Sequence, residues 1–319
     1  MAVQEQEVPK MDYPPTESPP LEPLRPERPA GPTEPRWLWD SVRYRFWDPT
    51  DLAGGIRRAG PFTVEQREAI ASWWSLLAAV EGLGPRLYAA AFVRATEQHD
   101  SDQVRWSLLA MLRDEVQHEE LCRLALEHLA PGWPLHDAPP TSPGRRLHEA
   151  YERAEHYWHG CQRALSQDGI GVVEGGLLLV ELVTAGLYER WATGCTIPIF
   201  ATAFRHAARD AQRHQAVLRA LACRDWPRLG ASGRTETAAQ VQTAAGYLSA
   251  MVLRPFGEER EPPVELLARH AGFGVPTAQQ RQEVLRAALL EVKDLQDRYD
   301  IPFPAMPRLA ILGTAAGAV

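Results

Sequence analysis

The chain has 319 residues, of which 45% are hydrophobic and 24% are charged, and its formal net charge is -7 at pH 7. This length and apolar content suffice for one large domain or two small ones with a sizeable core. The acidic balance and the lack of a basic stripe argue against nucleic acid as a partner.

The sequence also lacks the patterns of a membrane or exported protein. No apolar run reaches the roughly 18 to 20 residues that a membrane-spanning helix needs. The N-terminus carries acidic residues and prolines, whereas a secretory signal has a basic stretch followed by an apolar one. The cysteines lie far apart, at Cys122, Cys161, Cys195 and Cys223. Such spacing is typical of reduced thiols, so we expect a cytoplasmic protein with no membrane partner.

The N-terminal part of the chain differs from the rest. Residues 1–36 contain ten prolines and few large apolar side chains. Such a segment cannot bury enough surface to order itself, which predicts a disordered, proline-rich arm. Residues 37–61 are rich in aromatic residues followed by turn formers, which predicts an irregular segment packed on the domain.

Helical patterns fill the remainder of the chain. The segment Thr63-Val64-Glu65-Gln66 has the pattern of a capping box and predicts a helix start near Val64. Alternating β-branched runs, which would indicate strands, are nearly absent. The predicted helices cover residues 64–95, 102–129, 145–166, 170–192, 198–223, 234–253 and 277–298. The predicted fold class is therefore all-α.

A weak internal duplication runs through these helices. Residues 113–118 and 209–214 both read Arg-Asp-x-x-x-His. Each is preceded by a Val-Glu-Gly, at residues 80–82 and 173–175. The duplication predicts two similar helix pairs that face each other.

The spacing of the duplicated residues suits a metal cage. Glu81 lies 34 residues before Glu115, and Glu174 lies 37 residues before Ala211. A short turn between two long helices would bring each earlier glutamate level with the later motif. Residues three apart in a helix, such as Glu115 and His118, project into the same space. Two such pairs and two single glutamates would give four carboxylates and two imidazoles, which are donors that suit two Fe or Mn ions.

This arrangement resembles the ferritin-like di-iron oxidases, in particular the small subunit of ribonucleotide reductase and its ligand-binding oxidase relatives. It is also similar to the p-aminobenzoate-type N-oxygenases. The resemblance covers about residues 37–225 and is carried by the Asp-Glu-x-x-His and Val-Glu-Gly stretches. It implies a four-helix bundle in residues 37–230, with an extra helix between its halves. Residues 231–319 would form a helical extension packed on that bundle.

The resemblance also implies a set of metal ligands. They are Glu81, Glu115, His118, Glu174 or Glu181, and His214. The family has a glutamate where the second motif has Ala211. Three interpretations stay open: Asp210 replaces the missing ligand, Asp210 holds a ligand histidine by its other nitrogen as Asp114 would do, or the site is degenerate and binds one metal ion or none.

The ligand from the fourth predicted helix is open as well. Glu174 and Glu181 are seven residues apart and share a helix face. The Val-Glu-Gly repeat favours Glu174, whereas Glu181 could supply the carboxylate that the second motif lacks. Pro85 predicts a kink beside Glu81, because it cannot donate to the carbonyl of that residue. His206 is a weaker candidate for an additional ligand.

The predicted function is that of an O2-activating di-iron oxidase or oxygenase acting on a small organic substrate. Its cofactors would be two iron ions, with manganese and iron as a variant, and O2 would be the co-substrate. Electrons would come from an external donor such as a reductase, because no flavin or nicotinamide fingerprint is present. The family hints at a homodimer. The alternative is a non-catalytic ferritin-like scaffold or partner subunit with a degenerate metal site.

Overall fold

The computed structural model describes residues 47–131, 142–253 and 263–304. The predicted N-terminal arm, residues 1–36, lies outside the described residues. Every regular element within the described ranges is a helix or a helical turn, so the predicted all-α class is confirmed.

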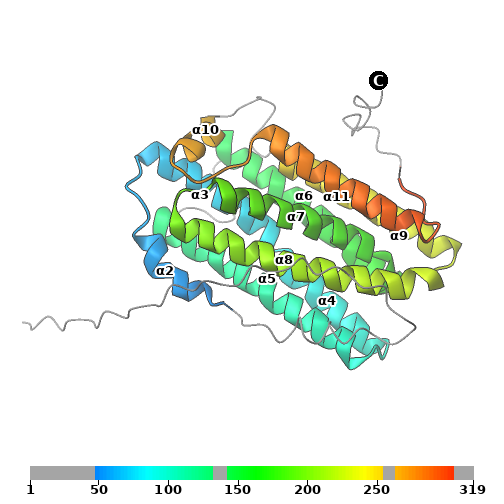
Figure 1. The fold of residues 1–319 in the computed structure, drawn as a ribbon. Coiled ribbons are helices and arrows are strands. Elements are labelled where there is room, and N and C mark those ends of the chain that lie inside the picture. Colours follow the sequence, from blue (N-terminus) through cyan, green and yellow to red (C-terminus); the bar gives the residue numbers. More distant parts are fainter. Residues whose placement is uncertain (1–46, 132–141, 254–262, 305–319) are drawn as a thin grey trace, which may run out of the picture. The chain divides into compact units, whose positions relative to one another are not determined.

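The helices follow one another with short connections (Figure 1). The α-helices are α2 (Pro49–Arg57), α3 (Val64–Glu81), α4 (Gly84–Glu97), α5 (Asp102–Leu129), α6 (Ser142–Asp168), α7 (Glu174–Gly194), α8 (Pro198–Asp225), α9 (Ala231–Leu248), α10 (Pro263–His270) and α11 (Ala278–Asp297). Three shorter turns complete the set: η1 (Ile170–Val172), η2 (Trp226–Arg228) and η3 (Ser249–Leu253).

Most predicted helix ends lie within a few residues of the observed ones, because the capping residues determine them. The Thr63 hydroxyl accepts from the backbone N–H of Gln66, and the Gln66 side-chain oxygen accepts from the backbone N–H of Thr63, which completes the predicted capping box of α3. Ser101 caps α5 through the backbone N–H of Val104. Pro198 occupies the first turn of α8, where its missing N–H costs no hydrogen bond.

A helical bundle forms the centre of the fold. Helices α3 and α4 both pack on α5, α5 packs on α8, and α8 packs along α7. Figure 1 shows α5, α8 and α7 running side by side as long rods. Helix α6 packs on α3, α4 and α9, while α9 and α11 both pack on α7. These contacts cover the bundle with helices from the middle and the end of the chain.

The first long helix of the bundle is interrupted. The sequence predicted one kinked helix over residues 64–95, but α3 ends at Glu81 and α4 begins at Gly84. Pro85 lies in the first turn of α4 and has no N–H for the carbonyl of Glu81. The chain therefore turns between the two helices, directly after Glu81.

The aromatic segment before α3 is not irregular throughout, as the sequence had suggested. Residues 49–57 form α2, which packs on α5 and α8. Asp48 caps this helix by accepting from the backbone N–H of Thr50 at 2.8 Å. The weak helical pattern of this short, glycine-containing segment explains why it was missed.

A buried ion pair holds the last two helices together. The Arg281 guanidinium on α11 donates to the Glu265 carboxylate on α10 at 2.8 and 3.1 Å, and both side chains are buried. The same guanidinium lies over the ring of Trp73 on α3, 5.8 Å from the ring centre. This arginine thus connects the C-terminal helices to the start of the bundle.

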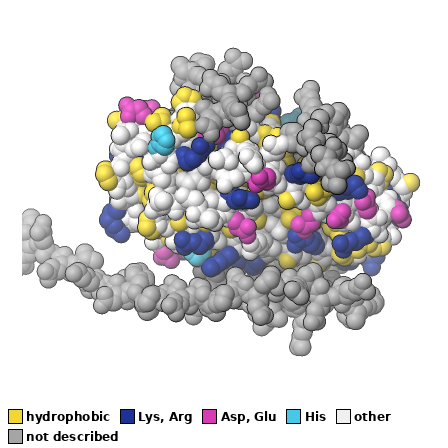
Figure 2. Space-filling view, turned by 45° about the horizontal axis from the view of Figure 1, so that its top comes forward, with side chains coloured by type: hydrophobic (Ala, Val, Ile, Leu, Met, Phe, Trp, Pro, Cys, Tyr) yellow, Lys and Arg dark blue, Asp and Glu magenta, His cyan; other side chains and the backbone are white. Residues whose placement is uncertain are grey.

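One stretch in the described ranges, Val64–Glu97, is long and apolar enough to cross a membrane by length and composition alone, with a mean hydropathy of 1.3. This differs from the expectation that no apolar run is long enough to span a membrane. The stretch contains the buried residues Trp73, Trp74 and Glu81, and 44% of its apolar window is buried inside the fold. On the face shown in Figure 2, acidic and basic side chains are interspersed among apolar ones.

Candidate metal centre

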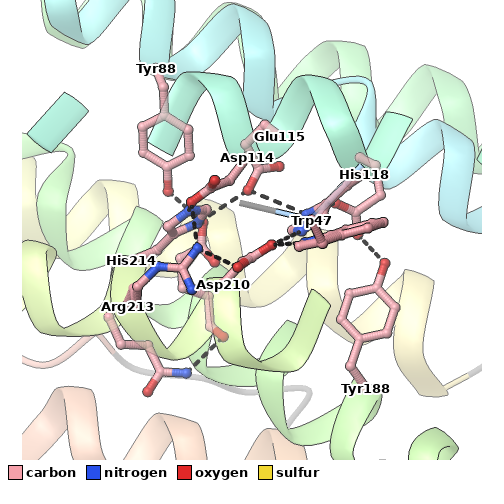
Figure 3. A network of polar contacts seen from close by, with 12 residues as sticks. Trp47, Tyr88, Asp114, Glu115, His118, Tyr188, Asp210, Arg213 and His214 are labelled. Atoms are coloured by element: carbon pink, nitrogen blue, oxygen red, sulfur yellow. Dashed lines mark hydrogen bonds and ion pairs between the residues drawn. The ribbon is translucent and has the colours of Figure 1, made fainter. Parts of the chain in front are cut away.

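A cluster of buried carboxylates and imidazoles lies in the middle of the bundle. Glu81 comes from the end of α3, Glu115 and His118 from α5, Glu181 from α7 and His214 from α8. Figure 3 shows Glu115, His118 and His214 of this cluster pointing toward one another from facing helices. We call these five residues the cage.

The cage consists of two overlapping groups that share Glu115. Glu81, Glu115 and His118 offer ligand atoms within 4.8 Å of one another, and so do Glu115, Glu181 and His214. His118 Nδ1 lies 3.2 Å from Glu81 Oε2 and 3.8 Å from Glu115 Oε1. His214 Nδ1 lies 3.2 Å from both Glu115 Oε1 and Glu181 Oε1. Each group therefore combines one carboxylate of its own, one imidazole and the shared carboxylate.

The other nitrogen of each histidine contacts an aspartate of the opposite motif. Asp210 Oδ2 lies 3.1 Å from His118 Nε2, and Asp114 Oδ2 lies 3.2 Å from His214 Nε2. Arg213 pairs with both aspartates, donating to Asp114 at 3.0 Å. Of the three interpretations of Asp210, this geometry matches the second, in which it holds a histidine by the nitrogen that faces away from the cage.

Trp47 extends this network toward the surface. Its indole N–H donates to Asp210 Oδ2 at 2.7 Å, and its ring stacks on His118 with 6.1 Å between ring centres. The ring of His206 stacks on the same indole at 5.1 Å. His206, a weaker candidate for a ligand, thus contacts Trp47 and belongs to neither group of the cage. No sequence pattern indicated this role of Trp47, because residue 47 precedes the predicted helices.

Two buried tyrosines bind the outer carboxylates of the cage. Tyr88 on α4 donates to Glu181 on α7, and Tyr188 on α7 donates to Glu81 on α3. Burial, followed by the charges of nearby glutamates, raises the pKa of both phenols well above its usual value. Both hydroxyls therefore stay protonated and can act as donors.

The tyrosines reveal the true register of the internal duplication. Residues 80–88 and 180–188 both read Val-Glu-x5-Leu-Tyr and lie 100 residues apart. Glu81 and Glu181 are equivalent in this repeat, and each glutamate accepts from the tyrosine of the other copy. This pattern was visible in the sequence, but the shorter Val-Glu-Gly match concealed it.

The preference for Glu174 is corrected accordingly. Glu174 begins α7 and is fully buried, and it faces the carboxylate of Asp225, with which it hydrogen-bonds when one of the two carboxyls is protonated. Burial first, and then the charge of Asp225, raises the pKa of this carboxyl well above its usual value. Glu174 lies on the same face of α7 as Glu181 but two turns away from it. It lies near Asp225 and Arg224 and does not reach the cage.

Ala211 borders a small cavity beside the cage. The cavity has a volume of about 30 Å³. Its lining includes the cage residues Glu81, Glu115, His118 and Glu181 as well as Gly84, Tyr88, Tyr157, Ala211 and Tyr247. Gly84 is required there, because a Cβ atom at this position would lie 1.9 Å from Glu115 Oε2. The backbone thus makes room for the shared carboxylate.

The electrostatics of the cage favour bound cations. Burial raises the pKa of Glu115 to about 7, against the hydrogen bond with His214 that lowers it. Burial lowers the pKa of His118, but its contacts with Asp210 and Glu81 outweigh this effect and raise it well above the usual value. A buried set of carboxylates is costly without positive charge. The cage offers three carboxylates and two Nδ1 atoms from four helices, and aspartates hold both Nε2 atoms. This donor set fits a pair of divalent transition-metal ions.

No family model, curated protein or solved structure matches this chain. The fold and the site together define an all-α helical bundle with a buried carboxylate and histidine cluster that could hold metal ions. Its function is therefore inferred from the geometry of the cage.

Proposed function

We propose that this chain is a ferritin-like dimetal oxidase or oxygenase that uses O2 to oxidise a small organic molecule. One observation carries the proposal: two groups of three ligand residues share Glu115 inside a buried bundle core. Surface acidic clusters are common without any ion, but three buried carboxylates need compensating positive charge, which two bound ions would supply in place of protons on His118 and His214.

The residues of the cage would divide the work between two ions. Glu81 and His118 would hold one ion, Glu181 and His214 would hold the other, and Glu115, which belongs to both groups, could contribute to both. Carboxylate and imidazole donors suit Fe and Mn, so a di-iron or a manganese and iron pair fits this donor set. Such a pair, once bound, supplies the redox chemistry that side chains lack.

The surrounding residues would keep the ligands in place. Asp210 and Asp114 fix the orientation of His118 and His214 through their Nε2 atoms, so that Nδ1 faces the cage. Arg213 balances the charge of the two aspartates. Tyr88 and Tyr188 restrict the outer glutamates. The large buried side chains around α3 and α8 separate the centre of the bundle from bulk water.

External electrons would enter through Trp47. This indole is partly buried, so it lies between the surface and the cage. It is hydrogen-bonded to Asp210, which contacts His118 in turn. The series Trp47, Asp210 and His118 is a continuous route from the edge of the protein to a ligand of the cage.

A second candidate is the non-catalytic scaffold. Ala211 favours it, since the second motif offers no carboxylate of its own, and so does the small size of the cavity. The two candidates differ in one respect: the oxidase needs two bound ions and the scaffold needs none.

Oxygen consumption by the Fe(II)-loaded chain tests the proposal. We expect Fe(II)-dependent O2 uptake by the unaltered chain and its loss in His118→Ala. His156→Ala, which removes an exposed histidine of α6, serves as the matched control and should keep full uptake. Full uptake by His118→Ala would remove the cage from the chemistry.

A further inference from the structure

The cavity beside Ala211 occupies the place where a further cage ligand would lie. The first motif has Glu115 three residues before its histidine, whereas the second has Ala211. Ala211 is buried and borders the cavity together with Glu115 and Glu181. Compared with a glutamate, its side chain lacks the two carbons and two oxygens beyond Cβ. The fold thus leaves space at a position that would otherwise hold a carboxylate.

Two tyrosine hydroxyls at the same cavity lack an oxygen or nitrogen partner among the described residues, although the Tyr157 hydroxyl interacts with the Cys161 thiol, a weak acceptor. Tyr157 comes from α6 and Tyr247 from α9, and their rings stack with 5.1 Å between centres and 2° between planes. Their exposures are only 1% and 5%, so both hydroxyls are cut off from bulk water. Both residues line the cavity. Buried hydroxyls normally have a partner, so this pair indicates a ligand with oxygens that can accept.

Size and chemistry limit what this ligand can be. A cavity of about 30 Å³ holds a few heavy atoms and excludes a drug-sized molecule. On one side it meets hydroxyl donors, and on the other it meets the ligand residues of the cage. A carboxylate satisfies both sides, because one oxygen can accept from the tyrosines while the other faces the ions.

The summed charge of the ions and the residues around the cavity permits an anionic ligand but does not by itself require one. The three glutamates of the cage carry three negative charges against the four positive charges of two divalent ions, which leaves a local excess of one. Asp114 and Asp210, which contact the Nε2 atoms of the histidines, and Arg213, which pairs with both aspartates, together add a net charge of -1. The acceptor oxygens that the two hydroxyls require therefore decide the ligand class.

We propose that this cavity binds a small carboxylate of the size of formate, which accepts from Tyr157 and Tyr247 and takes the place of the side-chain carboxylate absent at Ala211. The inference rests on the proposed function, because the bound ions form one wall of the site. It adds to that function the chemical class of the ligand that binds in the cavity beside Ala211.

Formate is the probe for this site. Sodium formate is titrated into the anaerobic, Fe(II)-loaded chain by calorimetry, with sodium chloride of equal ionic strength as the reference and iron content measured in the same sample. We expect saturable binding of one formate per iron-loaded chain. We expect at least about tenfold weaker binding to the iron-free chain, because one wall of the site is then missing.

Variants separate this inference from the proposed function. The double variant Tyr157→Phe with Tyr247→Phe should keep its iron and bind formate at least about tenfold more weakly, since it lacks two donors to a charged acceptor. It should also fold, because the interaction it loses within the protein is the weak one between the Tyr157 hydroxyl and the Cys161 thiol. Tyr299→Phe, which removes a phenol that packs on Trp226 outside the cavity, should bind as the unaltered chain does. Ala211→Glu should keep its iron and lose formate binding.

The outcomes are distinguishable. An iron-loaded chain without saturable formate binding would overturn this inference and leave the proposed function standing. Equal formate affinity in the double tyrosine variant would overturn it as well. Failure to bind iron at all would overturn both.

Discussion

Asp210 and His118 lie 92 residues apart on different helices, yet Oδ2 of the aspartate is 3.1 Å from Nε2 of the histidine. Asp114 and His214 make the reciprocal contact at 3.2 Å. Each Asp-x-x-x-His motif therefore orients the histidine of the other motif rather than its own. The two halves of the cage depend on each other, and a change in one half should be felt in the other.

Asp210→Asn should weaken metal binding without removing a ligand. Loss of such an orienting partner typically costs about 10- to 100-fold in metal affinity. We expect this loss in a titration against a competing chelator, with two irons per chain still bound at saturation. Asp297→Asn, at an exposed position of α11, is the control and should leave the affinity unchanged. A fall to one iron per chain at saturation would show that Asp210 is itself a ligand.

Glu181→Gln and Glu174→Gln should differ in iron content. Glu181 is one of three ligand residues in the second group of the cage, whereas Glu174 belongs to neither group. The Glu181 variant should therefore bind one iron and the Glu174 variant two, as measured by elemental analysis after anaerobic loading. The reverse result would return the ligand role to Glu174.

Glu174→Gln should also stabilise the protein at neutral and alkaline pH. Burial raises the pKa of the Glu174 carboxyl well above its ordinary value of 4.5. Above about pH 4.5 the unfolded chain releases this proton, whereas the folded chain keeps it. The stability contributed by Glu174 is therefore fully present below about pH 4.5 and is lost as the pH rises toward the pKa of the folded state. Glutamine stays neutral throughout.

Denaturant unfolding of the unaltered chain and of Glu174→Gln at several pH values measures this effect. The free energy of unfolding of the variant should match that of the unaltered chain near pH 4. Its advantage should then grow by up to about 1.4 kcal/mol per pH unit until the folded pKa is reached. A variant that is less stable at pH 8 would mean that ionised Glu174 has a stabilising partner, for which nearby Arg224 is the candidate.

Gly84→Ala should disrupt the cage while the helices persist. The new methyl group would lie 1.9 Å from Glu115 Oε2 and 2.5 Å from its carboxyl carbon, so the shared carboxylate must move. We expect loss of both irons with unchanged helical circular dichroism. Gly160→Ala is the matched control, because nothing lies within 4 Å of a Cβ at that position of α6. It should keep both irons and gain about 0.5–1 kcal/mol of stability.

Local patterns made the helices predictable. Capping residues such as Thr63 and Ser101, together with prolines, define where helices begin, and they act within a few residues of the chain. Glu115 and His118 were predictable for the same reason, since their shared helix face follows from their spacing. The break after Glu81 was predicted only as a kink, because sequence shows that Pro85 lacks an N–H but not how far the chain then turns.

Contacts between distant helices were not predictable in the same way. The choice between Glu174 and Glu181 depends on how α7 lies along the other helices, and two turns of a helix separate the two carboxylates. The crossing of the aspartates and tyrosines between motifs is likewise a property of packing. Only the Val-Glu-x5-Leu-Tyr repeat carried that information in the sequence, because a repeat keeps equivalent residues in equivalent places.

The most direct test of the central claim is the iron content of the chain after anaerobic Fe(II) loading and desalting, measured by elemental mass spectrometry. Two overlapping ligand groups that share Glu115 predict two irons per chain. One iron or none would contradict the dimetal cage and make Ala211 the mark of a scaffold that has lost its metal site.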